Sequence, residues 1–161
     1  MTNIKKWFGK SKILNLNGEP LVVYHGTITP GFDIFKKQGY HNLFGMDDGF
    51  YFTDSPEEAS GYAIENYDNL SKGRKGVGAV YPSFLKIIKP ADLRPDTWNV
   101  DDINVQEFLE NMDLDGLLVE LKAKGYDGII YDGTLVPIPV TGNHYLVFES
   151  EQIHTAIVNF K

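Results

Sequence analysis

The sequence predicts an α+β fold in a single domain, on three observations. Short apolar and β-branched runs bounded by glycine or proline recur along the chain, as is typical of strands. Two later segments, 101–111 and 115–124, have aspartate at their starts and apolar residues at helical spacing, as is typical of helices. The length of 161 residues fits one domain with a full core, so we expect a single domain over residues 1–161.

Composition and charge narrow the classes of function. Apolar residues make up 42% and charged residues 23% of the chain, which favours a folded globule over a disordered segment. The net charge of −7 disfavours long-range attraction to nucleic acid or to an anionic membrane. The first ten residues lack the apolar core of a signal peptide, and no stretch approaches the roughly 20 apolar residues of a membrane helix. We therefore expect a cytoplasmic protein with no membrane partner.

Several familiar chemistries are absent from the sequence. The chain has no cysteine, which excludes disulfides and thiolate zinc ligands. Its four histidines lack metal-ligand spacing with one another, so no metal site is expected. Neither a GxGxxG nor a GxxxxGKS phosphate loop occurs, and there is no Gly-x-Ser-x-Gly nucleophile elbow.

Residues 12–25 predict a β-hairpin that leads into a candidate site. The strand 12–16 is followed by the turn 17–20, whose Asn-Gly pair favours positive φ, and by the return strand 21–25. That strand ends at His25-Gly26-Thr27, which brings an imidazole, a backbone without a side chain and a hydroxyl to one place. We interpret this tripeptide as the floor of a binding site. The alternative is a strand that ends in a turn, with a histidine hydrogen-bonded locally.

The segment 49–63 predicts a strand followed by a helix. Residues 49–53 have strand character, and the next five, Asp-Ser-Pro-Glu-Glu, combine a capping side chain, a proline and acidic residues as at a helix start. The helical spacing directs Tyr62 toward Tyr51, so that two phenol rings can enclose a flat ring. Two tyrosines in the hydrophobic core are the alternative.

Two neighbouring features have simpler interpretations. Glu57 and Glu58 do not form an acid–base pair, because adjacent helical residues diverge by about 100°, and helix-start electrostatics explains them better. Residues 39–49 carry three glycines and no clear period, so we expect a loop over the site.

The remaining segments extend the sheet and include one basic loop. Pro82 indicates an edge strand or a bulge within the strand predicted at 77–89. The loop 70–78 contains lysines, an arginine and glycines, and is either a solvated loop or a contact surface for an acidic partner. Further strands are predicted at 126–131, 144–149 and 153–160.

Together, these motifs resemble a known enzyme class. Tyr24-His25-Gly26-Thr27 and Gly49-x-Tyr51-Phe52, followed eleven positions after Tyr51 by Tyr62, are similar to the first two motifs of the His-Tyr-Glu class of ADP-ribosyltransferases, which includes diphtheria toxin and the poly(ADP-ribose) polymerases. The longer pattern resembles the ADP-ribosyltransferase domains of phage and mobile-element polyvalent proteins. Its further matching segments are 6–12, 17–27, 51–54, 84–86, 125–130 and 147–153.

The resemblance implies the α+β ADP-ribosyltransferase fold, a split and strongly bent mixed sheet with flanking helices and NAD in its cleft. In this family pattern His25 would bind an adenosine-side ribose hydroxyl and the Gly26 backbone would pair with the nicotinamide amide. Tyr51 and Tyr62 would stack on the nicotinamide. Thr27 and Phe52 are expected to line the same NAD site.

The third motif departs from the family pattern. A glutamate just before the last core strand, in a pattern like Glu-Tyr-Ile-Val-Tyr-Asp, contacts the ribose 2′-hydroxyl in the family. Aligning 145–148 with that pattern puts His144 at the position of the catalytic glutamate. Glu149 lies five residues further on, and strand alternation directs it to the opposite face. With His25 and Tyr51, His144 and Glu149 are the candidate catalytic residues.

The resemblance implies an NAD-dependent mono-ADP-ribosyltransferase, a glycosyltransferase that releases nicotinamide. We expect a phage or bacterial effector that acts in the host cytoplasm on a macromolecule, a protein rather than a nucleic acid. The alternative is a weak or inactive NAD- or ADP-ribose-binding module, an inhibitor acting through the loop 70–78. An RNA 2′-phosphotransferase, a related activity on the same fold, is disfavoured by the acidic net charge.

Overall fold

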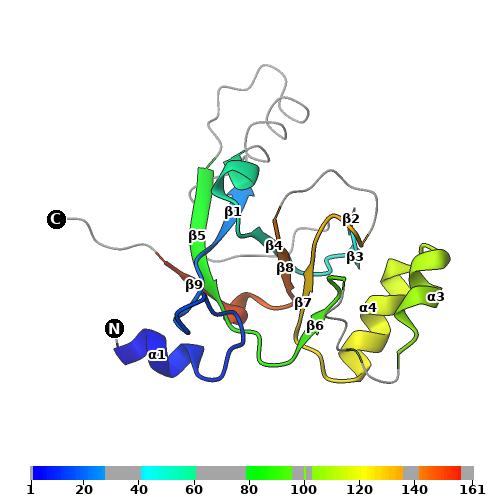
Figure 1. Ribbon diagram of the computed structural model, residues 1–161, viewed down its shortest axis with the longest axis horizontal. Helices are drawn as coiled ribbons and strands as arrows, with labels where there is room; N and C mark the ends of the chain where they lie inside the picture. The colour runs from blue at the N-terminus through cyan, green and yellow to red at the C-terminus, as the bar shows by residue number, and fades with distance from the viewer. Residues whose placement is uncertain are drawn as a thin grey trace, which may run out of the picture.

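The centre of the molecule is a seven-stranded sheet in the order β6-β7-β8-β4-β1-β5-β9 (Figure 1). The computed structural model describes residues 2–27, 41–60, 79–95, 100, 103–135 and 142–156. The strands are β1 (Val23–Thr27), β4 (Phe50–Thr53), β5 (Ala79–Leu85), β6 (Pro90–Asp92), β7 (Gly128–Tyr131), β8 (His144–Val147) and β9 (Ile153–Thr155). β6 and β7 pair in parallel and the other neighbours are antiparallel, so the sheet is mixed. With its flanking helices it confirms the predicted α+β class.

The sheet divides into two well-paired parts between β1 and β4. β4 pairs with β8 over four residues and β1 pairs with β5 over five. β1 and β4, in contrast, are in register at one position, Tyr24 opposite Thr53. The backbones of β1 and β4 therefore meet at a single point, and the residues around that point come from both parts of the sheet.

Helices flank the two ends of the sheet (Figure 1). α1 (Thr2–Phe8) lies near β9, where the Trp7 ring is 5.3 Å from the His154 ring. α3 (Val105–Glu110) and α4 (Leu114–Ala123) lie beyond β6 and β7. Asn104 caps α3 through its side chain, so this helix begins later than the segment 101–111 predicted from the aspartates at its start. None of the helices in the described part of the chain is long and apolar enough to span a membrane.

Each face of the sheet covers a hydrophobic core. On one face Leu146 and Ile129 pack with Leu117 and Leu121 of α4. On the other face Phe52 and its neighbours pack with residues from the N-terminal segment. Successive strand residues point to opposite faces, so Tyr51 borders the first core while Phe52 lies in the second.

Three local predictions need correction. Residues 12–16 do not form a strand of the sheet, and only an isolated bridge joins Leu14 to Pro20, although Gly18 adopts the expected positive φ of 77°. β5 lies between β1 and β9, so Pro82 is not on an edge strand. The described part of the loop 39–49 holds the two short strands β2 (His41–Asn42) and β3 (Gly45–Met46), and places Phe44 fully in the core.

Candidate functional site

The candidate site lies where β7, β8, β4 and β1 meet in one row. Tyr131 is opposite His144, His144 is opposite Thr53, and Thr53 is opposite Tyr24. Side chains opposite each other in neighbouring strands share a face. The row therefore brings the position of the third sequence motif next to the strand that carries Tyr51.

His25 is held by the backbone of the neighbouring strand. Its Nδ1 lies 2.8 Å from the carbonyl oxygen of Tyr51, and its ring centroid is 5.5 Å from that of Phe52. Because a carbonyl only accepts, Nδ1 carries the proton and donates it. Burial lowers the pKa of His25, against the smaller raising effect of that hydrogen bond. The imidazole is therefore neutral and oriented.

Gly26 is required by the helix that follows β4. A Cβ atom at this position would overlap the backbone carbonyl oxygen of Ala59. The absence of a side chain lets the helix at 56–60 approach β1 closely. Gly26 thus has a structural reason that is independent of the nicotinamide contact implied by the family resemblance.

Tyr51 is fixed at both its ring and its hydroxyl. The hydroxyl donates to the Asp48 carboxylate and accepts a 3.2 Å bond from the Phe44 amide, while the ring meets Tyr131 edge-on at 6.4 Å. Burial, and then the nearby charge of Asp48, raise the pKa of the Tyr51 hydroxyl above its ordinary value. Tyr51 is therefore a neutral phenol whose orientation does not depend on a ligand.

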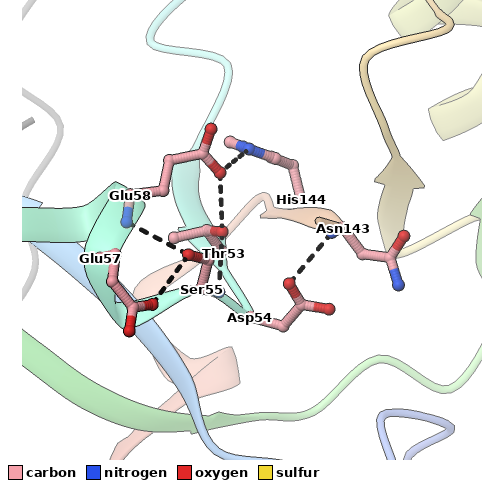
Figure 2. A network of polar contacts seen from close by, with 7 residues as sticks. All are labelled: Thr53, Asp54, Ser55, Glu57, Glu58, Asn143 and His144. Atoms are coloured by element: carbon pink, nitrogen blue, oxygen red, sulfur yellow. Dashed lines mark hydrogen bonds and ion pairs between the residues drawn. The ribbon is translucent and has the colours of Figure 1, made fainter. Parts of the chain in front are cut away.

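His144 is paired with a carboxylate from the helix start. Its Nε2 lies 2.8 Å from Glu58 Oε1, and the same oxygen accepts a 3.1 Å hydrogen bond from the Thr53 hydroxyl (Figure 2). The His144 and Glu58 side chains are 4% and 13% exposed. The imidazole also lies 5.3 Å from the Tyr131 ring. His144 and Thr53, which are buried, and Glu58, which is largely buried, thus form a polar cluster beside Tyr131.

Glu149 lies apart from this cluster. His144 is the first residue of β8, whereas Glu149 follows the end of that strand and is exposed. Five extended residues span about 16 Å. The Glu149 amide donates to the side chain of Gln152, which also binds the backbone of Phe148 and of two residues in other segments, Lys86 and Asp127. The Gln152 side chain therefore joins the segment after β8 to the residue after β5 and the residue before β7.

The structure describes only some of the other residues that were predicted to bind the cofactor. Phe52 is 1% exposed and borders the site through the ring of His25. Thr27 is the last residue of β1 and pairs with Ala79 through its backbone. Tyr62 and the basic loop 70–78 lie outside the described residues.

Three residues of the site were not recognised in the sequence. Asp48 stands three positions before Tyr51, and Tyr131 ends an apolar strand, but neither pattern is specific. Glu58 was assigned to helix-start electrostatics, and Ser55-x-x-Glu58 has the spacing of a capping box. That local signal is correct for Ser55, whose hydroxyl accepts from the Glu58 amide at 3.2 Å. It gave no indication that the Glu58 carboxylate binds His144.

The described residues offer no cluster of three or more histidine, cysteine, aspartate or glutamate side chains able to hold a metal ion. The polar groups of the site are instead two neutral rings, His25 and Tyr51, the Asp48 carboxylate on the Tyr51 hydroxyl, and one carboxylate–imidazole pair. Such a set suits a ligand with hydroxyls and a flat ring.

Comparison with known proteins identifies a family. The family described as ADP-ribosyltransferase in polyvalent proteins matches residues 15–160, which is nearly the whole chain. Comparison with curated protein sequences gives no significant match. The family match and the mixed sheet together confirm the ADP-ribosyltransferase fold.

Proposed function

Because the chain belongs to the family of ADP-ribosyltransferases in polyvalent proteins, we propose that it is an NAD-dependent mono-ADP-ribosyltransferase. The reaction transfers one ADP-ribose unit from NAD to a macromolecule and releases nicotinamide. The observation that carries this proposal is a chain of contacts that links three of the expected residues. The His25 imidazole is bound to the backbone of Tyr51, and the Tyr51 ring is joined through Tyr131 to His144.

The proposed reaction depends on orientation of the leaving ring and stabilisation of positive charge more than on covalent catalysis. Cleavage of the bond between ribose C1 and the nicotinamide nitrogen leaves a sugar with oxocarbenium character, so the site has to orient the leaving ring and stabilise positive charge. Tyr51 supplies an oriented ring and His25 supplies a neutral imidazole for a ribose hydroxyl. Both are held by the protein before any ligand arrives, which reduces the entropy lost on binding.

The acceptor and setting are part of the proposal. The net charge of −7 favours a protein acceptor over a nucleic acid, because phosphates are repelled by the chain as a whole. We propose an effector of phage or bacterial origin that acts in the cytoplasm of a bacterial host. The family's occurrence in polyvalent proteins supports this setting.

A second candidate function has one observation in its favour. His144, not a carboxylate, is the residue of β8 that lies opposite Thr53. A neutral imidazole brings no negative charge to a developing cation. The chain would then be an NAD- or ADP-ribose-binding module that acts on a partner without turnover.

One experiment separates the two functions. Purified protein is incubated with NAD labelled in the adenylate, with and without a bacterial lysate, and free nicotinamide and labelled macromolecules are measured. The transferase predicts nicotinamide release and labelled product. Micromolar NAD binding by calorimetry, with neither nicotinamide nor label, would establish the binding module and exclude the transferase.

A further inference from the structure

We infer that Glu58 supplies the negative charge beside His144, acting through that residue as a positioning and electrostatic residue. The inference rests on the proposed function, since it assigns the group that stabilises the ribose cation. It places the carboxylate on the helix after β4 instead of at the start of β8. The residue that contacts the reacting region is His144, and Glu58 acts through it.

The Glu58 side chain takes a direction that a capping box would not give it. In a capping box the glutamate at the third helical position turns back to the amide of the capping residue. Here the amide of Ser55 donates instead to the Thr53 hydroxyl at 3.1 Å. The Glu58 carboxylate is released from the cap and accepts from Thr53 and from His144 (Figure 2). Thr53 therefore has two roles, and both place Glu58 beside the imidazole.

Hydrogen bonds also fix the backbone on the His144 side of the cluster. Asp54 and Asn143, the residues that precede Ser55 and His144, are joined by two hydrogen bonds of 3.1 Å, one between their backbones and one to the Asp54 side chain. Strand pairing then places Thr53 opposite His144. The helix start and the start of β8 are thus locked together, which sets the short distance between Glu58 and His144.

The Glu58–His144 pair is costly in hydration. A carboxylate buried beside an imidazole has lost most of its hydration, and replacing such a pair with apolar groups of similar volume is often neutral or stabilising. Stability alone does not account for the pair. Its position beside the tyrosines of the site, 5.3 Å from the Tyr131 ring, gives it a functional reason.

The pair also brings charge to this part of the sheet. A carboxylate only accepts, so in the proposed state Nε2 of His144 donates to Glu58. In that state the imidazole is neutral and the pair carries one negative charge, which acts over a longer distance in a water-poor site than in water. His144 stands where the family resemblance expects the catalytic glutamate. Glu58, 86 residues earlier in the chain, thereby supplies the charge that the family's glutamate would bring.

The main test compares two adjacent glutamates. Glu58→Gln removes the charge and keeps the size and an acceptor oxygen, whereas Glu57→Gln removes the same charge from an exposed side chain that contacts Ser55. With water as acceptor, the kcat for nicotinamide release is expected to fall about 100-fold or more in Glu58→Gln. The KM for NAD is expected to stay within about three-fold, and Glu57→Gln to behave as the wild type.

A charge relocation controls for a merely structural role. His144→Glu alone sets two carboxylates together, which raises their mutual repulsion, so it is expected to give no gain in turnover. The double variant Glu58→Gln, His144→Glu has one carboxylate again, now on β8. It is expected to recover at least ten-fold of the kcat lost in Glu58→Gln, which a loss of packing would not allow.

The outcomes distinguish this inference from the proposed function. A wild-type protein that binds NAD without releasing nicotinamide overturns both. An active wild type with an equally active, folded Glu58→Gln overturns only the inference, as does a gain of turnover in His144→Glu alone. If Glu58→Gln is unfolded by circular dichroism, nitrogen-15 NMR of the wild-type histidines decides instead. An imidazolium at His144 under assay conditions would cancel the charge and overturn the inference, and a neutral ring protonated at Nε2 would support it.

Discussion

His25 and His144 approach the same part of the sheet from different strands and are held in different ways. His25 on β1 donates from Nδ1 to the backbone carbonyl of Tyr51. His144 on β8 is bonded through Nε2 to the carboxylate of Glu58. The first partner is part of the sheet and has no net charge. The second comes from a helix and brings a full charge.

This difference separates two requirements of the proposed reaction. A carbonyl partner orients an imidazole and, with burial, leaves it neutral, which suits recognition of a ribose hydroxyl. A carboxylate partner alters the local charge, which suits stabilisation of a cation. Substitutions around His25 should therefore disturb orientation, while those around His144 should disturb charge.

The largest effect is expected from removing the oriented ring. His25→Ala and Tyr51→Ala should each abolish NAD turnover, a loss of about 100-fold or more, because misplacement of the substrate by an ångström has that effect. Nicotinamide release at saturating NAD measures it. His154→Ala is the control, since that histidine packs on Trp7 away from the site. Unchanged rates in the first two variants would show that the site is misplaced.

A smaller effect is expected where β1 and the helix after β4 approach each other. Gly26→Ala should displace the helix that carries Glu58, because the new methyl group overlaps the Ala59 carbonyl. Overpacking of this kind lowers the free energy of unfolding by about 1–3 kcal/mol. Urea denaturation measures it. Gly18→Ala, where no atom lies within 4 Å but φ is 77°, should lose only about 1 kcal/mol. Equal losses would mean that the close approach is unimportant.

Removing the Tyr51 hydroxyl should affect stability more than chemistry. Tyr51→Phe keeps the ring beside Tyr131 and deletes two hydrogen bonds, the one to Asp48, a carboxylate that is 1% exposed, and the 3.2 Å bond from the Phe44 amide. The expected loss is about 1.5 kcal/mol of unfolding free energy, because hydrogen bonds to charged groups are worth that much. Asp48 keeps its 2.9 Å bond from the Phe44 amide, which limits the loss. A large fall in kcat at wild-type stability would instead give the hydroxyl a catalytic role.

The smallest effect is a pH dependence of stability from His25. Burial lowers the pKa of this imidazole in the folded protein below its ordinary value of 6.5. Below that value the unfolded chain binds more protons than the folded one, so stability should fall as pH drops from 6.5 through the folded-state pKa. Denaturation midpoints measured over this range should fall less in His25→Gln than in the wild type. An identical slope in both proteins would contradict the assigned neutral state.

Local patterns account for the parts of the fold that the sequence predicted well. The apolar face of α4 was visible because Leu117, Leu118 and Leu121 recur at helical spacing, and all three are buried. Ser55 and Pro56 predicted the helix after β4, and the Ser55 hydroxyl caps it. The hairpin strand 12–16 was overpredicted, because an apolar run that packs beneath a sheet has the same pattern as one that pairs within it.

The sequence by itself determined the α+β class and the family, and it predicted the two rings His25 and Tyr51, because each short motif depends on residues close together in the chain. Only the tertiary structure decided which polar groups meet. The partnership of Glu58 with His144 depends on the register of β4 with β8 and on the clearance at Gly26. Register and helix approach are set by packing over the whole sheet, and a carboxylate 86 residues from its imidazole leaves no periodic trace in the sequence.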